Sequence, residues 1–313
     1  MRSLGFAGLL LAVFLHPVLA DGPGDTPAID LRVTPVEISG GVLDGLVLHG
    51  TVELSADNPD FGGFSGLSVQ SGHLIAVSDR GHWLLADLED RSSGLFPVKA
   101  GYAAMRDSAG ARLEAGGSDA EGLTLRDGNL VVSFERDHRI AFHLQDGWLG
   151  DDFYNPAFER LSNNKGLEAL ATTPDGWILA IAEKPKSKGF PVFLIRYSGE
   201  VDRAWLPSDG RHYVTGADVG PDGRLYVLKR DFSLLLGISI LIDRYDLDAD
   251  GYPQAETRQR LARFDNATGI DNMEGISLWK DARGATRLAL ISDDNYNGFQ
   301  RTLLMDFSVL EEN

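Results

Sequence analysis

Cysteine is absent from the sequence, which excludes disulfide bonds and thiolate ligands. A chain of 313 residues without disulfides must be held together by a large core and a closed topology. Basic residues are also scarce, since 29 Lys and Arg stand against 46 Asp and Glu and leave a net charge of −17. This balance argues against DNA, RNA or anionic lipid as a partner. Where the carboxylates converge, their mutual repulsion favours divalent cations.

Long apolar runs are lacking as well. No segment reaches the ~18 uninterrupted apolar residues of a membrane span, and the longest candidate, residues 234–242, indicates a buried strand. The first 20 residues have the pattern of an export signal, with Arg2 at a positive start, an apolar core over residues 9–15 and a small-residue cleavage site ending at Ala20. We therefore expect a periplasmic or secreted protein whose residues 21–313 form a single domain.

An internal repeat is what the sequence does contain. Five segments share one pattern of a short strand, a tight turn and a second strand, and they begin at Ser65, Glu121, Glu168, Asp218 and Glu274. Asp-Gly pairs mark three of the turns, because these residues tolerate the positive φ of tight hairpins. The repeats recur every 47 to 56 residues, near the period of ~40 to 50 that is typical of four-stranded propeller blades.

The repeat predicts an all-β fold, a β-propeller of four-stranded antiparallel blades. Two further strand candidates precede the first repeat, at residues 29–36 and 46–54, and a last one follows the fifth at residues 302–309. Together these strands would complete a sixth blade and close the ring, which removes exposed sheet edges. We therefore expect six blades, with five or seven as the alternatives.

Charged residues recur at one position of the repeat. In an antiparallel hairpin the start of the first strand and the end of the second lie at the same end. The acids that open the first strands should thus gather with the charged pairs that close the second strands, around one mouth of the central channel. A single acid at a strand end is usually a solvated turn residue, but four at one register favour a site. The competing explanation is structural, in which each acid binds backbone N–H groups of the next blade.

This arrangement predicts a metal and anion site. Carboxylates from separate strands supply the oxygen ligands that Ca²⁺ prefers, and the candidate ligands are Glu121, Glu168, Asp218, Glu274 and Asp293. Cationic side chains between them could bind a substrate anion, and the candidates are Arg80, Arg136, Lys184 and Arg230. The candidate catalytic residues are Glu121, Glu168, Glu274 and His82, the last as a proton donor. The alternative for His82, and for His138 in a similar place, is a surface loop histidine.

Other catalytic patterns are missing. No paired histidines stand at zinc spacing. The sequence around Ser65 lacks the second spaced glycine of a nucleophile elbow, which disfavours a serine hydrolase.

The repeat motifs resemble those of the phytase-like domain family, also called the esterase-like activity of phytase family. The resemblance rests on Ser78-Asp79-Arg80-Gly81, Ala120-Glu121-Gly122-Leu123, Phe134-Glu135-Arg136, Asn164-Lys165-Gly166-Leu167-Glu168-Ala169-Leu170, Ala217-Asp218-Val219-Gly220-Pro221-Asp222-Gly223, Asn272-Met273-Glu274-Gly275-Ile276 and Ile291-Ser292-Asp293-Asp294-Asn295. It implies a repeat domain rich in acidic residues with phosphoesterase or esterase-like hydrolysis. It also implies a design similar to calcium-dependent propeller phytases, in which acids at the channel mouth hold metals against substrate phosphates.

The leading hypothesis is an exported, monomeric hydrolase that uses a divalent cation, Ca²⁺ first among the candidates, to cleave a small anionic phosphate ester. Two alternatives remain open. One is a propeller that binds a ligand or protein without turnover, because fold is a poor guide to activity. The other is a carboxylester or lactone hydrolase at the same site.

Overall fold

The computed structural model describes residues 26–39, 41–91, 94–143, 149–162, 165–233 and 237–310. The expected export signal, residues 1–20, lies outside this part of the chain. Within it, no helix is long and apolar enough to cross a membrane.

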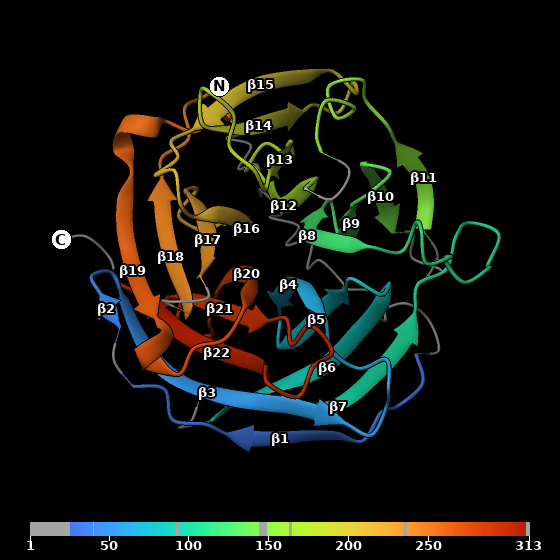
Figure 1. The fold of residues 1–313 in the computed structure, drawn as a ribbon, viewed down its shortest axis with the longest axis vertical. Helices are drawn as coiled ribbons and strands as arrows, with labels where there is room; N and C mark the ends of the chain where they lie inside the picture. The colour runs from blue at the N-terminus through green and yellow to red at the C-terminus, as the bar shows by residue number, and fades with distance from the viewer. Residues whose placement is uncertain are drawn as a thin grey trace, which may run out of the picture.

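Five antiparallel sheets form a ring of blades around one axis (Figure 1). The first blade consists of β4 (Phe64–Gln70), β5 (His73–Ser78), β6 (His82–Arg91) and β7 (Gly94–Ala104). The second consists of β8 (Ala120–Arg126), β9 (Asn129–Phe134), β10 (Arg139–His143) and β11 (Leu149–Phe153). The third consists of β12 (Leu167–Thr172), β13 (Ile178–Ala182), β14 (Phe190–Ile195) and β15 (Val201–Leu206).

The last two blades have five strands each. The fourth consists of β16 (Tyr213–Val219), β17 (Leu225–Ser233), β18 (Gly237–Tyr245), β19 (Gln259–Asp265) and the short β2 (Val42–Leu43). The fifth consists of β20 (Met273–Lys280), β21 (Thr286–Ser292), β22 (Thr302–Val309), β3 (Leu46–Ala56) and β1 (Leu31–Pro35). Two short 3₁₀ helices, η1 (Ala255–Thr257) and η2 (Asn266–Thr268), flank β19.

The expectation of six blades is wrong, and the amino-terminal strands explain why. The inner strands β4, β8, β12, β16 and β20 contact one another in that order, and β20 contacts β4, so five blades close the circle. β3 pairs with β22 and thereby supplies the fourth strand of the fifth blade, with β1 outside it. The amino- and carboxy-terminal strands do close the ring together, as expected. They do so by completing the fifth blade, which β20 and β21 begin, and not by forming a sixth.

The core lies between neighbouring blades because each sheet is covered on both faces. Alternate residues of β17 show the arrangement: Tyr226 and Leu228 pack in a cluster with the fifth blade, whereas Leu225 and Val227 pack in a cluster with the third. Burial on both faces requires near-continuous apolar strands. The strand Ile178–Ala182, in which every residue is buried, is an example.

Small residues allow the inner strands to meet at the axis. Each inner strand has a β-bulge near its first residue. The residue that follows the bulged one is Gly66, Gly122, Ala169, Gly216 or Gly275. A Cβ atom on Gly216 would lie only 2.4 Å from the carbonyl oxygen of Glu274 in the next inner strand. A ring of only five blades thus needs a small residue at this position, which is glycine in four blades and alanine in the third.

Candidate functional site

The bulges of the inner strands place one side chain of each blade at the end of the channel where these strands begin, which we call the mouth. The bulged residues form an inner ring of Ser65, Glu121, Glu168, Thr215 and Glu274. A bulge turns its residue out of the regular alternation and re-aims the side chain. Three of the five residues are glutamates, and they come from three different blades.

A second set of residues follows the second strand of each blade. The backbone N–H groups of Asp79, Glu135, Glu183 and Asp293 donate to the carbonyl group just before the inner strand of the same blade, at 2.8 to 3.2 Å. In the fourth blade Arg230 pairs with Tyr213 at the corresponding place. These five residues form an outer ring, which carries four acids and one arginine. The predicted gathering of charges at one mouth is therefore present.

Asp218 does not belong to this set, so its predicted equivalence with the three glutamates is wrong. It stands near the end of β16 and pairs with Tyr226, whereas Thr215 occupies the bulge. Its carboxylate accepts hydrogen bonds from the backbone N–H groups of Val219 at 2.8 Å and of Leu278, in the next blade, at 2.7 Å. Burial raises the pKa of Asp218 to about 7. Asp218 thus has the ring-locking role that was the competing explanation for the repeated acids.

Three acids of the second blade form the tightest carboxylate cluster among the described residues. Oxygen atoms of Asp119, Glu121 and Glu135 all lie within 4.8 Å of one another, and all three residues are buried. Burial raises the pKa of each carboxyl, and repulsion from Glu168 and Glu274 raises that of Glu121 further.

The remaining acids of the two rings extend this cluster across the channel. Burial and repulsion from Glu183 and Glu135 raise the pKa of Glu168 well above its usual value. Burial raises the pKa of Asp293 to about 8 and that of Asp79 to about 6. Repulsion of this kind is relieved either by protons or by a cation.

Four cationic side chains balance part of the negative charge. Arg136 binds Asp119 at 2.7 Å, Lys165 binds Glu183 at 2.9 Å, and Arg230 lies 3.5 Å from Glu274. Arg230 also donates to the side-chain oxygen of Asn272 at 2.5 Å. The guanidinium group of Arg80 lies 3.3 Å from the ring centre of Tyr296, in the loop that follows the outer ring of the fifth blade. Arg80 and Arg136 are exposed, which leaves them accessible to an anion.

Two predicted site residues lie outside these interactions. Lys184 is exposed and forms no ion pair with a described residue, while Lys165 takes the place beside Glu183. His82 is buried, stacks on the ring of Tyr102 with 5.0 Å between ring centres and lies 3.1 Å from Arg112. Burial lowers the pKa of His82, so its imidazole is neutral at pH 7.

His138 is also buried rather than a surface loop residue. Both of its ring nitrogens are buried. Its φ is 44°, and that of Arg136 is 66°, a conformation that costs non-glycine residues energy and is concentrated at functional sites.

The repeat places Glu135 and Glu183 at the mouth, in the charged pairs that close the second strands, but does not single them out as ligands. It gives no indication of Asp119, Lys165 or Thr215. Asp119 and Lys165 precede the inner strands, outside the strand–turn–strand pattern of the repeat. Thr215 carries no charge and gives no such signal.

The donor set fits a hard divalent cation. Asp119, Glu121 and Glu135 offer only carboxylate oxygens, the ligands of Ca²⁺, Mg²⁺ and Mn²⁺. Their pKa values are raised by burial. A cation that takes the place of the protons would offset the free-energy cost of the buried, ionised carboxylates. One contact also supports the structural alternative, because Glu135 accepts a hydrogen bond from the backbone N–H of Gly166 in the third blade at 3.2 Å.

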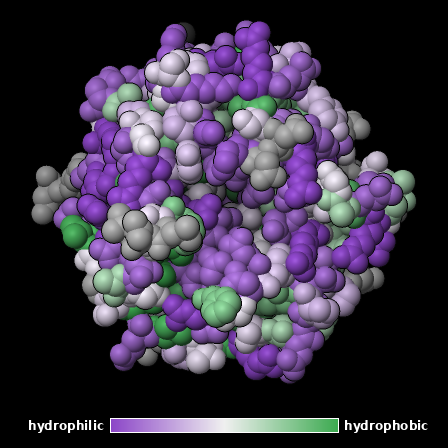
Figure 2. Space-filling model, in the orientation of Figure 1, coloured by the Kyte–Doolittle hydropathy of each residue, from purple (hydrophilic) through white to green (hydrophobic). Residues whose placement is uncertain are grey.

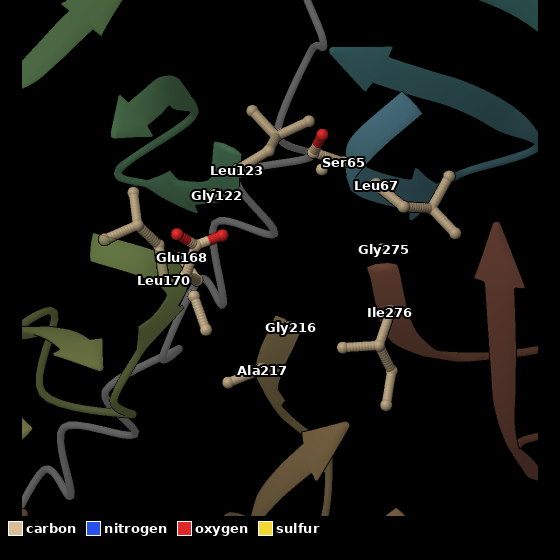
Figure 3. A pocket seen from close by; sticks show the side chains of 12 residues that line it. Ser65, Leu67, Gly122, Leu123, Glu168, Leu170, Gly216, Ala217, Gly275 and Ile276 are labelled. Carbon is tan, nitrogen blue, oxygen red and sulfur yellow. The ribbon is translucent and has the colours of Figure 1, made fainter. Parts of the chain in front are cut away.

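A cavity of about 10 Å³, room for about one water molecule, lies among the inner strands at the axis, next to Glu168 (Figure 3). Hydrophilic side chains surround the central hollow on the face drawn in Figure 2. This cavity is too small to admit a substrate.

Comparisons with known proteins give one family. The model of the Phytase-like family, described as esterase-like activity of phytase, matches residues 59–296. A search of curated proteins finds no match.

Similar solved structures include an oxidoreductase from Thermus thermophilus described as a glucose dehydrogenase. It is 14% identical over 88% of this chain and 99% of that chain, with a TM-score of 0.37. The PQQ-bound aldose sugar dehydrogenase of Streptomyces coelicolor is 12% identical over 90% of this chain and 99% of that chain, with a TM-score of 0.42. These similarities are too distant to indicate a shared activity.

Proposed function

Because the chain belongs to the Phytase-like family, we propose that it hydrolyses small esters of anionic character, phosphate esters first, with a divalent cation at the mouth of the propeller. The observation that carries this proposal is the convergence of buried carboxylates, with Asp119, Glu121 and Glu135 within 4.8 Å of one another. The ionised form of such a cluster is costly in water-excluding surroundings, and a divalent cation would compensate its charge.

Asp119, Glu121 and Glu135 would hold the cation, with Ca²⁺ the first candidate. When bound, a divalent cation polarises the ester oxygens and stabilises the negative charge that develops on them. The exposed guanidinium groups of Arg80 and Arg136 would bind the substrate anion, in the bidentate manner that suits phosphate. Arg136, on the second blade, binds Asp119 of the carboxylate cluster, and Arg80, on the first blade, lies over the ring of Tyr296.

A proton for the leaving group has a source at the outer ring. Asp293, with its pKa raised to about 8, is largely protonated at neutral pH, as a general acid must be. Asn272 donates to Asp293 at 3.2 Å and to Glu274 at 2.9 Å, which fixes both carboxyl groups. Asp293 is therefore better suited to proton donation than His82, whose neutral ring has no proton to spare at pH 7.

The test combines metal binding with turnover. The purified protein is assayed against phosphomonoesters, phosphodiesters, phytate and carboxylesters, with Ca²⁺ and after removal of metal by a chelator. We expect phosphoester hydrolysis that is lost with the metal. Turnover of carboxylesters alone would favour the esterase activity named in the family description. Phosphoester hydrolysis that survives complete metal removal would refute the proposed role of the cation.

The matched variants are Glu121→Gln at the cluster and Glu114→Gln at an exposed loop position. We expect Glu121→Gln to weaken Ca²⁺ binding at least tenfold in calorimetry, because it removes one charged ligand of three. The metal-free variant should be at least as stable as the wild type, because the repulsion that Glu121 suffers is gone. Glu114→Gln should change neither, and a Glu121→Gln variant with unchanged Ca²⁺ affinity would rule out this cluster as the metal site.

We also propose that the protein is exported and that residues 21–313 form one domain. Amino-terminal sequencing of the protein from the medium or periplasm tests the cleavage after Ala20.

A further inference from the structure

A serine, a histidine and an aspartate are connected by hydrogen bonds in the fourth blade and the loop that leads into it. Asp209 and His212 lie in the loop between β15 and β16, and Ser239 lies on β18. Nδ1 of His212 is 2.7 Å from Oδ2 of Asp209, and Nε2 is 3.0 Å from Oγ of Ser239. A hydroxyl group beside a base that a third group orients is the arrangement of an activated nucleophile.

The carboxylate of Asp209 fixes which ring nitrogen of His212 carries the proton. It accepts hydrogen bonds from the backbone N–H groups of Arg211 at 3.0 Å and of His212 at 2.9 Å. Against the effect of burial, these bonds and the imidazole lower the pKa of Asp209 to about 2. An ionised carboxylate only accepts hydrogen bonds, so Nδ1 of His212 must donate to it. Nε2 is then the acceptor for the hydroxyl proton of Ser239, as a general base must be.

A guanidinium group lies close to these residues. Asp231 of β17 pairs with Ser239 of β18, and residues directly opposite each other on paired strands share one face of the sheet. Nε of Arg211 binds Asp231 at 2.5 Å. Burial lowers the pKa of His212, and the charges of Asp231 and Arg211 also act on it. Arg211 is exposed and offers positive charge where a carbonyl oxygen becomes negative during attack.

We propose that Ser239, His212 and Asp209 form a second hydrolytic site, which cleaves carboxylesters of short acyl groups. Oγ of Ser239 bonds to the carbonyl carbon while its proton passes to Nε2 of His212, and the alcohol takes up that proton as the ester C–O bond breaks. Water, deprotonated by His212 in the same way, then hydrolyses the acyl-enzyme and releases the carboxylic acid. Ser239 is only 5% exposed, which restricts the substrates to small acyl groups.

Covalent labelling tests the nucleophile directly. Methanesulfonyl fluoride is a small reagent that sulfonylates activated serines with loss of fluoride. The protein is treated in the presence of a chelator and digested with trypsin, which releases residues 231–244 as one peptide containing Ser233 and Ser239. We expect one sulfonyl group per chain, which fragmentation in the mass spectrometer locates on Ser239. Asp209→Asn, which permits the wrong tautomer of His212, should slow the labelling at least roughly a hundredfold.

Release of 4-nitrophenol from 4-nitrophenyl acetate measures turnover. We expect the wild type to be active in the presence of chelator and Ser239→Ala to be at least roughly tenfold slower. Ser308→Ala is the matched control, since Ser308 of the fifth blade also contacts a histidine, His49, at 2.5 Å. This variant should leave labelling and turnover unchanged.

An unlabelled Ser239 in the wild type, or equal turnover by the wild type and Ser239→Ala, would overturn the inference. A lower Tm of Ser239→Ala with unchanged turnover would assign the three residues to holding the loop before β16 against β18. Neither result bears on the proposed phosphoester hydrolysis, because both experiments are carried out without a divalent cation.

Discussion

At the scale of single residues, the mouth is a set of carboxyl groups held where their charged forms are unfavourable. Burial is the largest cause of the raised pKa of Glu121, Glu168 and Asp293, and repulsion between them adds to it. Burial therefore makes the ionised forms of these acids costly in the metal-free fold, although the N–H of Asn295 and the side chain of Asn272 donate to Asp293.

This electrostatic cost predicts how stability depends on pH. In the folded state the pKa is raised to about 6 for Asp79, about 7 for Asp218 and about 8 for Asp293, against an ordinary value of about 4 in the unfolded chain. The folded state therefore binds more protons, and its stabilisation is complete below pH ~4 and is lost as the pH rises through 6 to 8. We expect the free energy of unfolding of the metal-free protein to be lower at pH 8 than at pH 5 by at least about 2 kcal/mol.

Urea denaturation at both pH values, with chelator and with Ca²⁺, measures this effect. Ca²⁺ should restore stability mainly at pH 8, because it replaces protons at the mouth. Asp209 has the opposite effect on the pH dependence of stability. Backbone N–H groups and His212 lower its pKa to about 2 against the effect of burial, so its contribution to stability changes only below pH ~4. Metal-free stability that rises from pH 5 to pH 8 would refute the raised pKa values.

At the scale of elements, the hairpins could be predicted from the sequence because their signals are local. The turn at Asp127 and Gly128 joins β8 to β9 as expected, with positive φ at both residues. The register of β16 could not be predicted in the same way. Its bulge lies at Thr215, which carries no charge, and the nearest acid, Asp218, belongs to the opposite end of the strand. Three of the five predicted metal ligands lie in the inner ring and Asp293 in the outer ring.

The inner strands pack closely against one another at their glycine positions, and this packing can be tested by substitution. Gly216→Ala would place a Cβ atom 2.4 Å from the carbonyl oxygen of Glu274 and 3.1 Å from Ile276. Backbone cannot move aside as a flexible side chain can, so we expect a loss of about 1 to 3 kcal/mol. The Tm should fall by roughly 2 to 12 °C, and Ca²⁺ affinity should fall too, because Glu274 lies at the mouth.

Gly116→Ala is the matched control, since a Cβ atom there meets nothing within 4 Å. Thermal unfolding of the two variants and the wild type, followed by circular dichroism, gives the comparison. Equal Tm values for Gly216→Ala and Gly116→Ala would contradict the close packing of the inner strands.

At the scale of the whole molecule, the number of blades follows from how the ring closes. The repeat gives five inner strands, and the sequence before Ser65 contains strands without a repeat of its own. Local patterns cannot show whether such strands form a new blade or complete an existing one, because both use the same apolar residues. The pairing of β3 with β22 decides it, and this pairing joins segments from opposite ends of the chain.

The same pairing yields a prediction about stability. Val47 of β3 lies opposite Ser308 of β22, and Val47 is exposed. Since the chain has no cysteine, Val47→Cys with Ser308→Cys introduces a single disulfide across this seam. Restricting so long a loop in the unfolded chain stabilises the folded state by up to about 5 kcal/mol in the chain-entropy account, less any strain.

We expect the oxidised variant to unfold at a clearly higher guanidinium concentration than the same variant under dithiothreitol. The reduced form should lie near the wild type, apart from the lost contact between His49 and Ser308. Across paired strands the disulfide leaves the folded state unchanged and restricts only the unfolded chain, so it should raise the midpoint. Equal midpoints for the oxidised and reduced forms would therefore contradict the idea that the β3–β22 pairing holds the ring closed.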